Sequence, residues 1–320
     1  IPAPLVNQAL KQCGKKKIKN VIIISAGFSE KGNFELEKQL LKTAKKYKIK
    51  ILGPNCFGIA NPRINLDCTF ANSTPKKGST AFISQSGALW SYISDFPETK
   101  ISNFVSLGNQ AILTFSDFIE YFNQDPKTKR IVLYIEKLKQ GKRFIEICRK
   151  SKKPIIVIKA GKTKKGTEAT ISHTGSLATD FKIYQGAFKQ AKVKIVNTLA
   201  EAFNIKPQKF NLKNKSKKEI TLIGNAGGAI ALLTDILSKR GIKIKSKDLL
   251  GTALAKDYKK AMGKKHKKII ILTPQRMSQP KEVAKLLKKR DIAIFLGKNS
   301  MQEAKKILKT KKIKYYNKVI

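Results

Sequence analysis

One short segment combines a reactive side chain with residues that leave backbone N–H groups accessible. The segment 172–178, Ser-His-Thr-Gly-Ser-Leu-Ala, holds one of only two histidines among 320 residues. A neutral imidazole is a competent nucleophile near neutral pH, and a nest of N–H groups beside it would suit phosphate. The alternative is structural: Ser172 or Thr174 caps the helix expected around Tyr184. The segment alone leaves both interpretations open.

Two further stretches could hold an anion. Each follows an apolar strand and leads into a helix: Ser84-Gln-Ser-Gly-Ala88 and Gly224-Asn-Ala-Gly-Gly228. A helix that starts in small residues presents free N–H groups and the positive end of its dipole, at the sheet edge where ligands bind in such folds. Tight turns that need small residues for packing are the structural alternative. Together with the His173 segment, the two turns favour a shared phosphate site.

Other candidate motifs carry less weight. Gly161-Lys162-Thr163 ends like a nucleotide-binding P-loop, but Ile156 stands where the first glycine should be. His266 lies in a lysine run and is expected on the surface. Cys56 is interpreted as a small packed residue. The four cysteines have no metal-type spacing, so we expect no metal site and reduced thiols, which favours the cytoplasm.

The composition is strongly basic. There are 67 Lys and Arg against 21 Asp and Glu, a formal net charge of +46, which would attract nucleic acid. The lysines are spread along the whole chain, however, and aromatic residues make up only 8% and do not interleave with the basic runs. We therefore expect no specific nucleic-acid partner. No apolar run approaches the roughly 18 residues of a membrane span, so a soluble protein without a membrane partner is expected.

Short β-branched runs alternate with amphipathic stretches, which predicts an α/β fold with parallel sheets covered by helices. The first domain is expected at 1–72, with strands at 20–25 and 49–52. Two strands are too few for an independent sheet of this kind, and the chain starts at Ile1 without a leader. We therefore expect the chain to hold only the C-terminal half of a Rossmann-like domain.

Two flavodoxin-like domains are expected to follow, at 78–206 and 219–320, joined by linkers at 72–78 and 206–218. The strands of the first are expected near 80–84, 103–106, 130–135, 154–159 and 194–196, with a loop at 160–171. The strands of the second are expected near 220–224, 242–245, 268–273 and 291–296, with helices after Gly228, Gly251, Pro280 and Ser300.

Several motifs stand in an order that identifies a family. They are Ser25–Phe28, Gly53–Cys56, Thr80–Leu89, Phe104–Asn109, Tyr134–Glu136, Lys159–Gly161, Ser172–Ala178, Asn225–Gly228 and Thr273–Gln275. In this order the chain resembles the α subunit of ADP-forming acetyl-CoA (acyl-CoA) synthetases, of the succinyl-CoA synthetase superfamily, with an N-terminal truncation. The resemblance implies a partial CoA-binding domain followed by two succinyl-CoA synthetase-like domains.

The resemblance also implies an activity, that of an acid–thiol ligase. Acyl-CoA, ADP and phosphate would interconvert with the free acid, CoA and ATP through an acyl phosphate. By position His173 would be phosphorylated, and Glu136 would be the carboxylate that hydrogen-bonds it. ADP or ATP with Mg²⁺ would be bound by a partner, an ATP-grasp β subunit or domain, in a hetero-oligomer.

The remaining site residues are carried over from the same family. The phosphate-binding residues would be Ser84, Ser86, Gly87, Thr174, Gly175, Asn225, Ala226 and Gly227. The residues at the CoA and acyl site would be Ser25, Ala26, Pro54, Asn55, Gly108 and Asn109.

Departures from the family pattern keep a second function open. The N-terminal glycine-rich loop that would hold the CoA phosphates is not in the sequence, and Glu136 is followed by Lys137 rather than glycine. A non-catalytic CoA-binding or regulatory relative is therefore the alternative to the enzyme. A basic nucleic-acid-binding protein is the third interpretation, after these two. The acyl group, the stoichiometry and the choice of ADP or GDP do not follow from the sequence.

Overall fold

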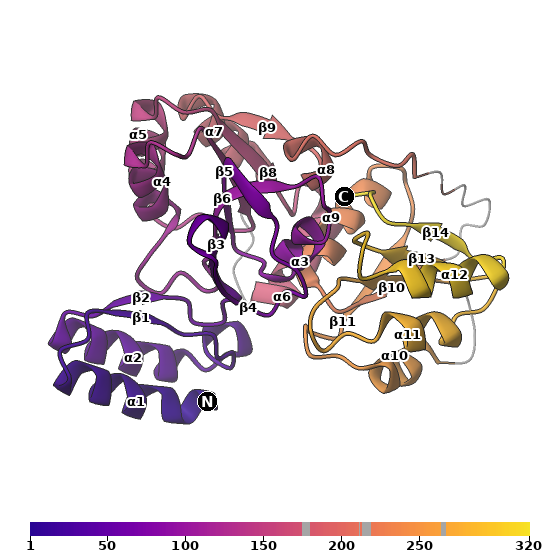
Figure 1. Ribbon diagram of the computed structural model, residues 1–320, viewed down its shortest axis with the longest axis horizontal. Helices are drawn as coiled ribbons and strands as arrows, with labels where there is room; N and C mark the ends of the chain where they lie inside the picture. The colour runs from indigo at the N-terminus through magenta and orange to yellow at the C-terminus, as the bar shows by residue number, and fades with distance from the viewer. Residues whose placement is uncertain (175–179, 211, 213–218, 264–266) are drawn as a thin grey trace.

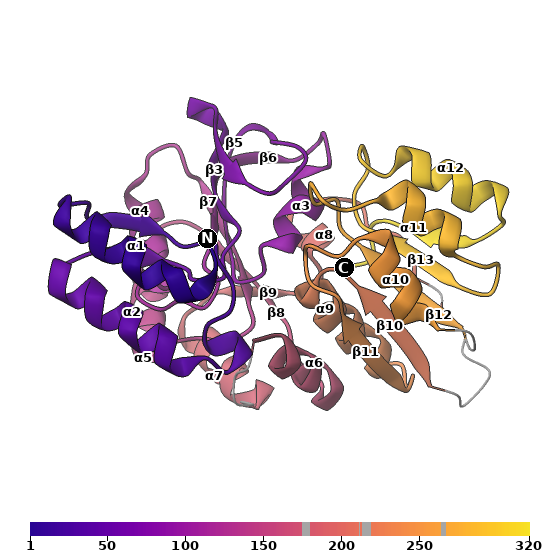
Figure 2. The same cartoon turned by 90° about the horizontal axis from the view of Figure 1, so that it is seen from below.

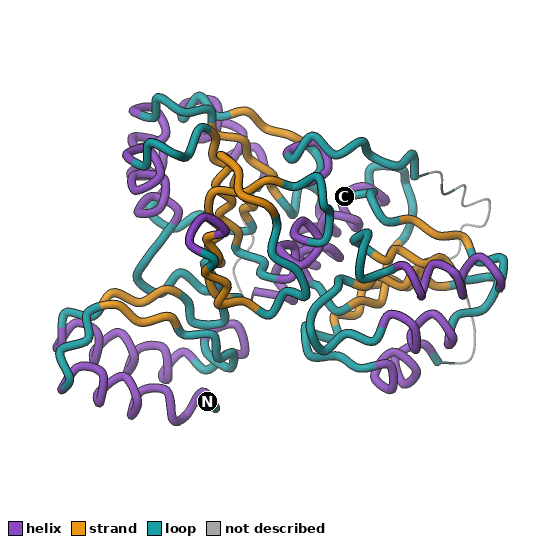
Figure 3. Tube along the Cα trace, viewed as in Figure 1, coloured by secondary structure: helices purple, strands orange, loops and turns teal. Residues whose placement is uncertain are grey.

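A computed structural model describes residues 1–174, 180–210, 212, 219–263 and 267–320, with the backbone alone at 172–174. The described strands form sheets of two, five and seven strands, and helices cover their faces (Figures 1 and 3). None of the described helices combines the length and apolar character needed to cross a membrane.

The first unit is a two-stranded parallel sheet with two helices on one side (Figure 1). Its elements are α1 (Ala3–Lys15), β1 (Asn20–Ile22), the 3₁₀ turn η1 (Ser29–Lys31), α2 (Phe34–Tyr47) and β2 (Lys50–Leu52). Leu40, Thr43 and Ala44 form the buried stripe of α2, at the i, i+3, i+4 spacing that places side chains on one helix face. Leu40 and Ala44 pack with residues of α1 and β2 into a small separate core.

The next strands belong to the second sheet, although the predicted domain boundary lay at residue 72. β3 (Gly58–Asn61) and β4 (Leu66–Thr69), joined by the 3₁₀ turn η2 (Pro62–Ile64), form an antiparallel pair. β3 also pairs antiparallel with β6, Ile59 opposite Val105. These four-residue strands were not predicted because Gly, Asn and Asp weaken their hydrophobic pattern.

The second sheet has the order β4-β3-β6-β5-β7-β8-β9. Its last five strands follow the sequence order 2-1-3-4-5, which is the flavodoxin-like order, and this confirms the predicted fold class. The elements are β5 (Lys76–Ser84), α3 (Ala88–Ser94), β6 (Lys100–Ser106), α4 (Phe115–Gln124), β7 (Arg130–Ile135), α5 (Gly141–Lys150), β8 (Ile155–Lys159), α6 (Lys164–Thr174), α7 (Phe181–Gln190), β9 (Lys194–Val196) and α8 (Leu199–Ala202). Apolar β-branched runs such as 155–158 are buried because helices cover both faces of the sheet.

The third sheet, β11-β10-β12-β13-β14, repeats the 2-1-3-4-5 order. Its elements are β10 (Ile220–Gly224), α9 (Gly227–Ser238), β11 (Ile244–Asp248), α10 (Ala255–Met262), β12 (Lys268–Leu272), α11 (Pro280–Leu286), β13 (Ile292–Phe295), α12 (Gln302–Thr310) and β14 (Lys314–Tyr316). The strand expected at 242–245 starts two residues later, and β14 was not predicted.

Three helices lie between the two larger sheets: α3, α6 and α9 (Figures 1 and 2). α9 contacts both α3 and α6 and is buried along nearly its whole length. One hydrophobic core joins the second unit (the second sheet and its helices, β3 to α8) to the third unit (the third sheet and its helices, β10 to β14), with Trp90 of α3 and Leu222 of β10 among its members. Because α3 follows β5 and α9 follows β10, the contact between these helices brings together the carboxyl ends of the first strands of both sheets.

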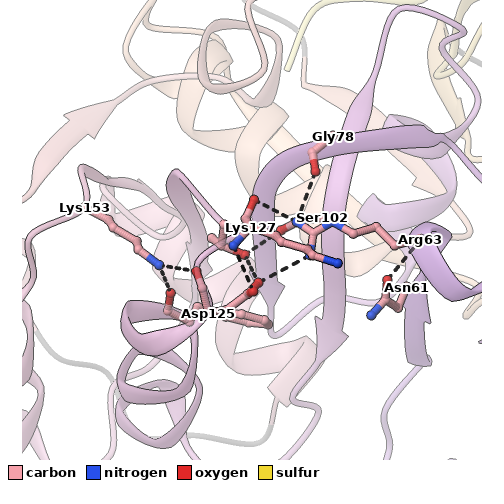
Figure 4. A network of polar contacts seen from close by, with 9 residues as sticks. Asn61, Arg63, Gly78, Ser102, Asp125, Lys127 and Lys153 are labelled. Carbon is pink, nitrogen blue, oxygen red and sulfur yellow. Dashed lines mark hydrogen bonds and ion pairs between the residues drawn. The ribbon is translucent and has the colours of Figure 1, made fainter.

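A polar network fixes the turn between β3 and β4 to β5 and to the loop after α4 (Figure 4). Arg63 Nη2 donates to the carbonyl oxygens of Gly78 and Lys127, at 3.2 and 2.8 Å. Its Nη1 lies 3.5 Å from the Asp125 carboxylate, which also accepts a 2.6 Å bond from the Thr128 hydroxyl. The guanidinium therefore connects three segments that are far apart in sequence.

Candidate functional site

The predicted loop at 160–171 is wrong, because α6 occupies residues 164–174. Thr163 Oγ1 accepts a 3.0 Å bond from Gly166 N, as an N-cap side chain does at a helix start. His173 therefore lies in the last turn of a helix rather than before one. Its side chain and residues 175–178, including Gly175, lie outside the described part of the chain.

The helix expected after His173 begins later than predicted. α7 starts at Phe181, and its N-cap is Asp180, whose carboxylate accepts a 2.8 Å bond from Lys182 N. The predicted capping role of Ser172 or Thr174 is therefore filled by Asp180. Ser172 and Thr174 are both part of the helical backbone of α6.

The two predicted glycine turns meet, as the sequence suggested. Ser86 follows β5 and is 3% exposed, and a Cβ on Gly228 of α9 would stand 2.6 Å from Ser86 Oγ. Gly87 is packed just as closely, since its Cβ would lie 2.0 Å from Phe57 Cβ. α3 and α9 start at Ala88 and Gly227, so the first-turn N–H groups of both helices come close to one another.

A cavity of about 480 Å³ opens where these turns meet the first unit. Its wall includes seven of the predicted residues: Ala26, Asn55, Ser86, Gly87, Asn225, Ala226 and Gly227. Polar groups that were not predicted, Glu30, Gln85 and Gln275, also line it, together with the apolar Phe57, Phe70, Leu250 and Met277. The volume is in the range of ordinary small-molecule sites, which lie between about 300 and 1,000 Å³.

Some predicted residues support this wall without lining it. Ser84 is fully buried, and its hydroxyl donates a 2.7 Å bond to the carbonyl oxygen of Ser86. Ser25 Oγ donates to the carbonyl oxygen of Ile1 at 2.6 Å. Asn225 does line the wall, but its side chain is held by Thr273, the residue after β12: Oδ1 accepts a 2.9 Å bond from Thr273 N, and Nδ2 donates to Thr273 O. The side chains of Ser84, Ser25 and Asn225 are thus hydrogen-bonded to backbone groups of neighbouring segments.

Gly108 and Asn109 join the first unit to the second sheet. Gly108 has a φ of +55°, and a Cβ there would lie 2.2 Å from the carbonyl oxygen of Pro54, so only glycine permits this approach. Asn109 N donates to the same carbonyl at 2.9 Å. Its side-chain Nδ2 lies 2.7 Å from Glu30 and 3.1 Å from Glu37, two carboxylates that were not predicted. Pro54 and Asn109 are thus brought into contact, although neither of them lines the cavity.

Glu136 directly follows β7 and is 5% exposed. Gln85 of the cavity wall positions it: Gln85 Oε1 accepts from Glu136 N at 2.6 Å and from Lys137 N at 2.8 Å. The Tyr134 hydroxyl lies 3.1 Å from Glu136 Oε1 and 3.3 Å from the Gly228 carbonyl oxygen. Burial, with the neighbouring Glu136 carboxylate, raises the pKa of Tyr134 well above its ordinary value.

Lys159, at the end of the adjacent strand β8, is a buried cation that was not predicted. Its ammonium lies 4.4 Å from the centre of the Tyr184 ring and donates to the carbonyl oxygen of Ala160. Burial lowers the pKa of Lys159 to about 8, an effect opposed by the charges of Glu136 and Asp235. A lysine that ends an otherwise apolar β-branched run at the carboxyl edge of a parallel sheet is the sequence signal for such a residue.

The described residues contain no group of His, Cys, Asp and Glu that could hold a metal ion. Cys56 lines the cavity, but its Sγ donates to the Ile23 carbonyl oxygen at 3.4 Å, and burial raises the pKa of the thiol to about 11. A protonated thiol is a poor nucleophile. Glu136 does not line the cavity itself but is linked to its wall through Gln85.

Comparison with known proteins gives this geometry a context. Residues 77–207 match the succinyl-CoA ligase like flavodoxin domain. The chain is 44% identical over 251 residues to the α subunit of ADP-forming acetate–CoA ligase II of Pyrococcus furiosus, covering 76% of this chain and 54% of that one. It is 46% identical over 240 residues to the ADP-forming acetate–CoA ligase of Methanocaldococcus jannaschii, covering 73% and 34%. The chain thus spans about a third to a half of the length of these relatives.

A solved structure covers nearly the whole chain. It is the dinucleotide forming acetyl-coenzyme A synthetase 1 of Ca. Korarchaeum cryptofilum, in complex with phosphate and ADP. The TM-score is 0.61 at 30% identity, with 99% of this chain and 78% of that one covered.

Proposed function

The chain belongs to the family of ADP-forming acetyl-CoA synthetases, and we propose that it is the acyl-transfer part of such an enzyme, in the cytoplasm. It would interconvert acyl-CoA, ADP and phosphate with the acid, CoA and ATP. The observation that supports this most is the single cavity at which the starts of α3 and α9 and the first unit meet, with Gln85 linking its wall to Glu136.

The proposed reaction has three bond exchanges. An oxygen of phosphate attacks the thioester carbon, the C–S bond breaks, and CoA leaves as the thiol. The imidazole of His173 then attacks phosphorus, and the P–O bond to the acyl group breaks, which releases the carboxylate. Finally a β-phosphate oxygen of ADP attacks phosphorus, and the P–N bond to His173 breaks to give ATP.

The described residues would act by holding charge in place. The backbone N–H groups at the start of α9, with Ser86 opposite, would bind the phosphoryl oxygens, which is where most catalysis of phosphoryl transfer arises. Glu136, oriented by Gln85, would hold the imidazole in the tautomer that leaves one nitrogen free to attack. Lys159 would balance the negative charge that accumulates beside Glu136.

CoA would enter from the side of the first unit, where Ala26 and Asn55 line the cavity. The nucleotide and Mg²⁺ would be bound by an ATP-grasp subunit or domain, since the described residues offer no metal-binding cluster. The protein would therefore work in a hetero-oligomer or as part of a longer chain.

Incubation with the ATP-grasp partner and γ-labelled ATP tests the proposal. We expect an acid-labile, base-stable label on the wild-type chain and none on His173→Asn. Equal labelling of the variant would refute the role of His173. A wild-type chain that binds acyl-CoA but neither accepts label nor supports ATP formation would instead be a non-catalytic relative.

A further inference from the structure

An acidic residue of the third unit occupies the P-loop-like tripeptide of the second. Asp235 lies on α9 and is 4% exposed. Its Oδ2 accepts bonds from Gly161 N at 2.8 Å and Lys162 N at 3.0 Å. Its Oδ1 accepts from Thr163 N at 2.8 Å and from Thr163 Oγ1 at 2.9 Å. One carboxylate thus receives three consecutive backbone N–H groups and a hydroxyl.

The tripeptide is a nest for an anion supplied by the same chain. Gly161 has a φ of +76°, the left-handed conformation that lets successive N–H groups converge on one point. The Lys162 ammonium does not take part, since it donates to Val196 O and Asn197 Oδ1, 3.2 and 3.1 Å away. The resemblance to a nucleotide-binding loop therefore reflects real anion-binding geometry, with Asp235 in the place of a phosphate.

Gly166 is the residue whose lack of a side chain allows this contact. A Cβ on Gly166, in the first turn of α6, would stand 1.9 Å from Asp235 Oδ1. Any larger residue would force the carboxylate out of the nest. Gly166 also donates its N–H to Thr163 Oγ1 at 3.0 Å, so the cap of α6 and the Asp235 contact share Thr163.

The helix held in this way is the one that bears His173. Ten residues separate Thr163 from His173, which at 1.5 Å per residue places His173 about 15 Å along the axis. α6 packs along α9 and also contacts η1, whose Glu30 and Lys31 line the cavity. Asp235 therefore fixes one end of a helix that connects α9 with the cavity.

We propose that Asp235 is a positioning residue for His173: it anchors the root of α6 to α9 and thereby holds the histidine-bearing end at the acyl-phosphate site. This inference rests on the proposed function. Loss of the anchor frees the helix, so transfer from acyl phosphate to His173 slows. In the proposed function, phosphorylation of His173 from ATP would take place at the ATP-grasp partner and would not need the docked helix.

Asp235→Asn in the complex with the ATP-grasp partner tests the proposal, because the amide keeps one acceptor but loses the charge and the second oxygen. Phosphohistidine formation is measured in both directions, from acyl-CoA with phosphate and from ATP. We expect the first rate to fall about tenfold or more, as for loss of charge-assisted bonds, and the second to stay within about twofold. Gly166→Ala keeps the aspartate at position 235 but pushes its carboxylate out of the nest, and it should lower the first rate and spare the second in the same way.

The matched control is Asp291→Asn. Asp291 is a buried acid of the same unit, and it accepts backbone N–H bonds from Lys288 at 2.9 Å and Lys268 at 3.3 Å, away from α6. Asp291→Asn should not change the ratio of the rate of phosphohistidine formation from acyl-CoA and phosphate to the rate from ATP. Equal losses in both directions for Asp235→Asn and Gly166→Ala, or no loss in either, would overturn the proposal.

A second measurement does not depend on activity. Amide hydrogen exchange at 161–167 should quicken in Asp235→Asn and remain unchanged in Asp291→Asn, since the anchor protects these groups directly. Unchanged exchange at 161–167 in Asp235→Asn would overturn the anchor itself. A wild-type complex without any phosphohistidine, but with faster exchange in Asp235→Asn, would refute the proposed function and leave the anchor standing.

Discussion

Replacing Gly228 by alanine tests whether the contact between the two helix starts is as close as the structure shows. The added Cβ would stand 2.6 Å from both Cβ and Oγ of Ser86 and 3.0 Å from the Tyr134 hydroxyl. Real Cβ atoms do not approach other carbons this closely, so α9 and the turn after β5 must separate. Ser86 is buried beside the start of α3 and has little space in which to retreat.

The expected change in the free energy of unfolding of Gly228→Ala has two contributions of opposite sign. Overpacking a buried contact destabilises by about 1–3 kcal/mol, whereas alanine in place of glycine in a helix stabilises by about 1 kcal/mol. Gly186→Ala is the matched control, because Gly186 lies in α7 and a Cβ there would meet nothing within 4 Å. Both variants gain the helix term. The difference in their free energies of unfolding should therefore equal the overpacking term alone, about 1–3 kcal/mol in favour of Gly186→Ala.

The assay combines urea unfolding with phosphohistidine formation from acyl-CoA and phosphate. A displacement of about 1 Å at a positioned phosphate site costs on the order of 10²-fold in rate, so we expect Gly228→Ala to fold but to be severely slowed. Gly186→Ala should keep wild-type activity. Equal stability and equal activity of the two variants would refute the close contact. Lost stability with full activity would show that the contact exists but does not form the phosphate site.

Three other substitutions probe the surroundings of the site. Gln85→Ala removes the acceptor of two backbone N–H groups, so urea unfolding should show a loss of about 1–3 kcal/mol, and the phosphohistidine yield should fall as Glu136 loses its support. Lys159→Met removes a buried ammonium whose pKa burial lowers to about 8. Because the unfolded chain binds this proton more tightly, wild-type stability rises with pH from about 8 to 10.5, and the variant should be more stable at pH 7 by up to about 3 kcal/mol. That advantage, measured by urea unfolding, should shrink by pH 9.5; an advantage that does not change with pH would contradict the lowered pKa. Arg63→Ala leaves the carbonyl oxygens of Gly78 and Lys127 without this donor and should cost about 1–3 kcal/mol in the same assay, whereas an unchanged midpoint would show that the network of Figure 4 adds nothing to stability.

The sheets could be predicted from the sequence because their strands are coded locally. Runs such as 131–135 and 269–272 are hydrophobic throughout and rich in β-branched residues, as is typical of strands buried on both faces. β3, β4 and β14 have three or four residues each and carry no such run. Their places are decided by pairing with a neighbouring strand, which the local pattern does not contain.

α6 is a helix that the local sequence pattern likewise did not predict. Residues 163–170 contain three threonines and a glycine, all poor helix formers, so a loop was the natural prediction. Thr163 caps the start of the helix, and the Asp235 carboxylate, 72 residues away in the sequence, accepts a bond from the Thr163 N–H and holds this residue against α9. The available signal was a single acid within the run 227–237, which has no other charged residue, since an acid buried in a helix needs partners from elsewhere.

The site was predictable in composition but not in orientation. The two glycine turns were expected to share a ligand, and both line one cavity. Ser84 and Ser25 have the right residue types, yet their hydroxyls are turned to backbone carbonyls. Gln85, by contrast, lies within the Ser84–Ala88 turn, but its residue type did not predict that its side chain would hold Glu136. Residue type alone does not reveal which way a side chain points.

The distribution of acids explains how such a basic chain holds two sheets together. With only 21 acids among 320 residues, buried carboxylates stand at junctions where backbone N–H groups converge. Asp95, at the end of α3, accepts from Lys298 N at 2.7 Å and from the Ser300 hydroxyl at 2.6 Å, and Asp235 holds 161–163. Both contacts run between the second and third units, in opposite senses: each unit donates one acid to a loop of the other. Because each carboxylate accepts short, charge-assisted bonds from backbone N–H groups, these two reciprocal contacts fix the second and third units to each other at two points beyond their shared apolar core.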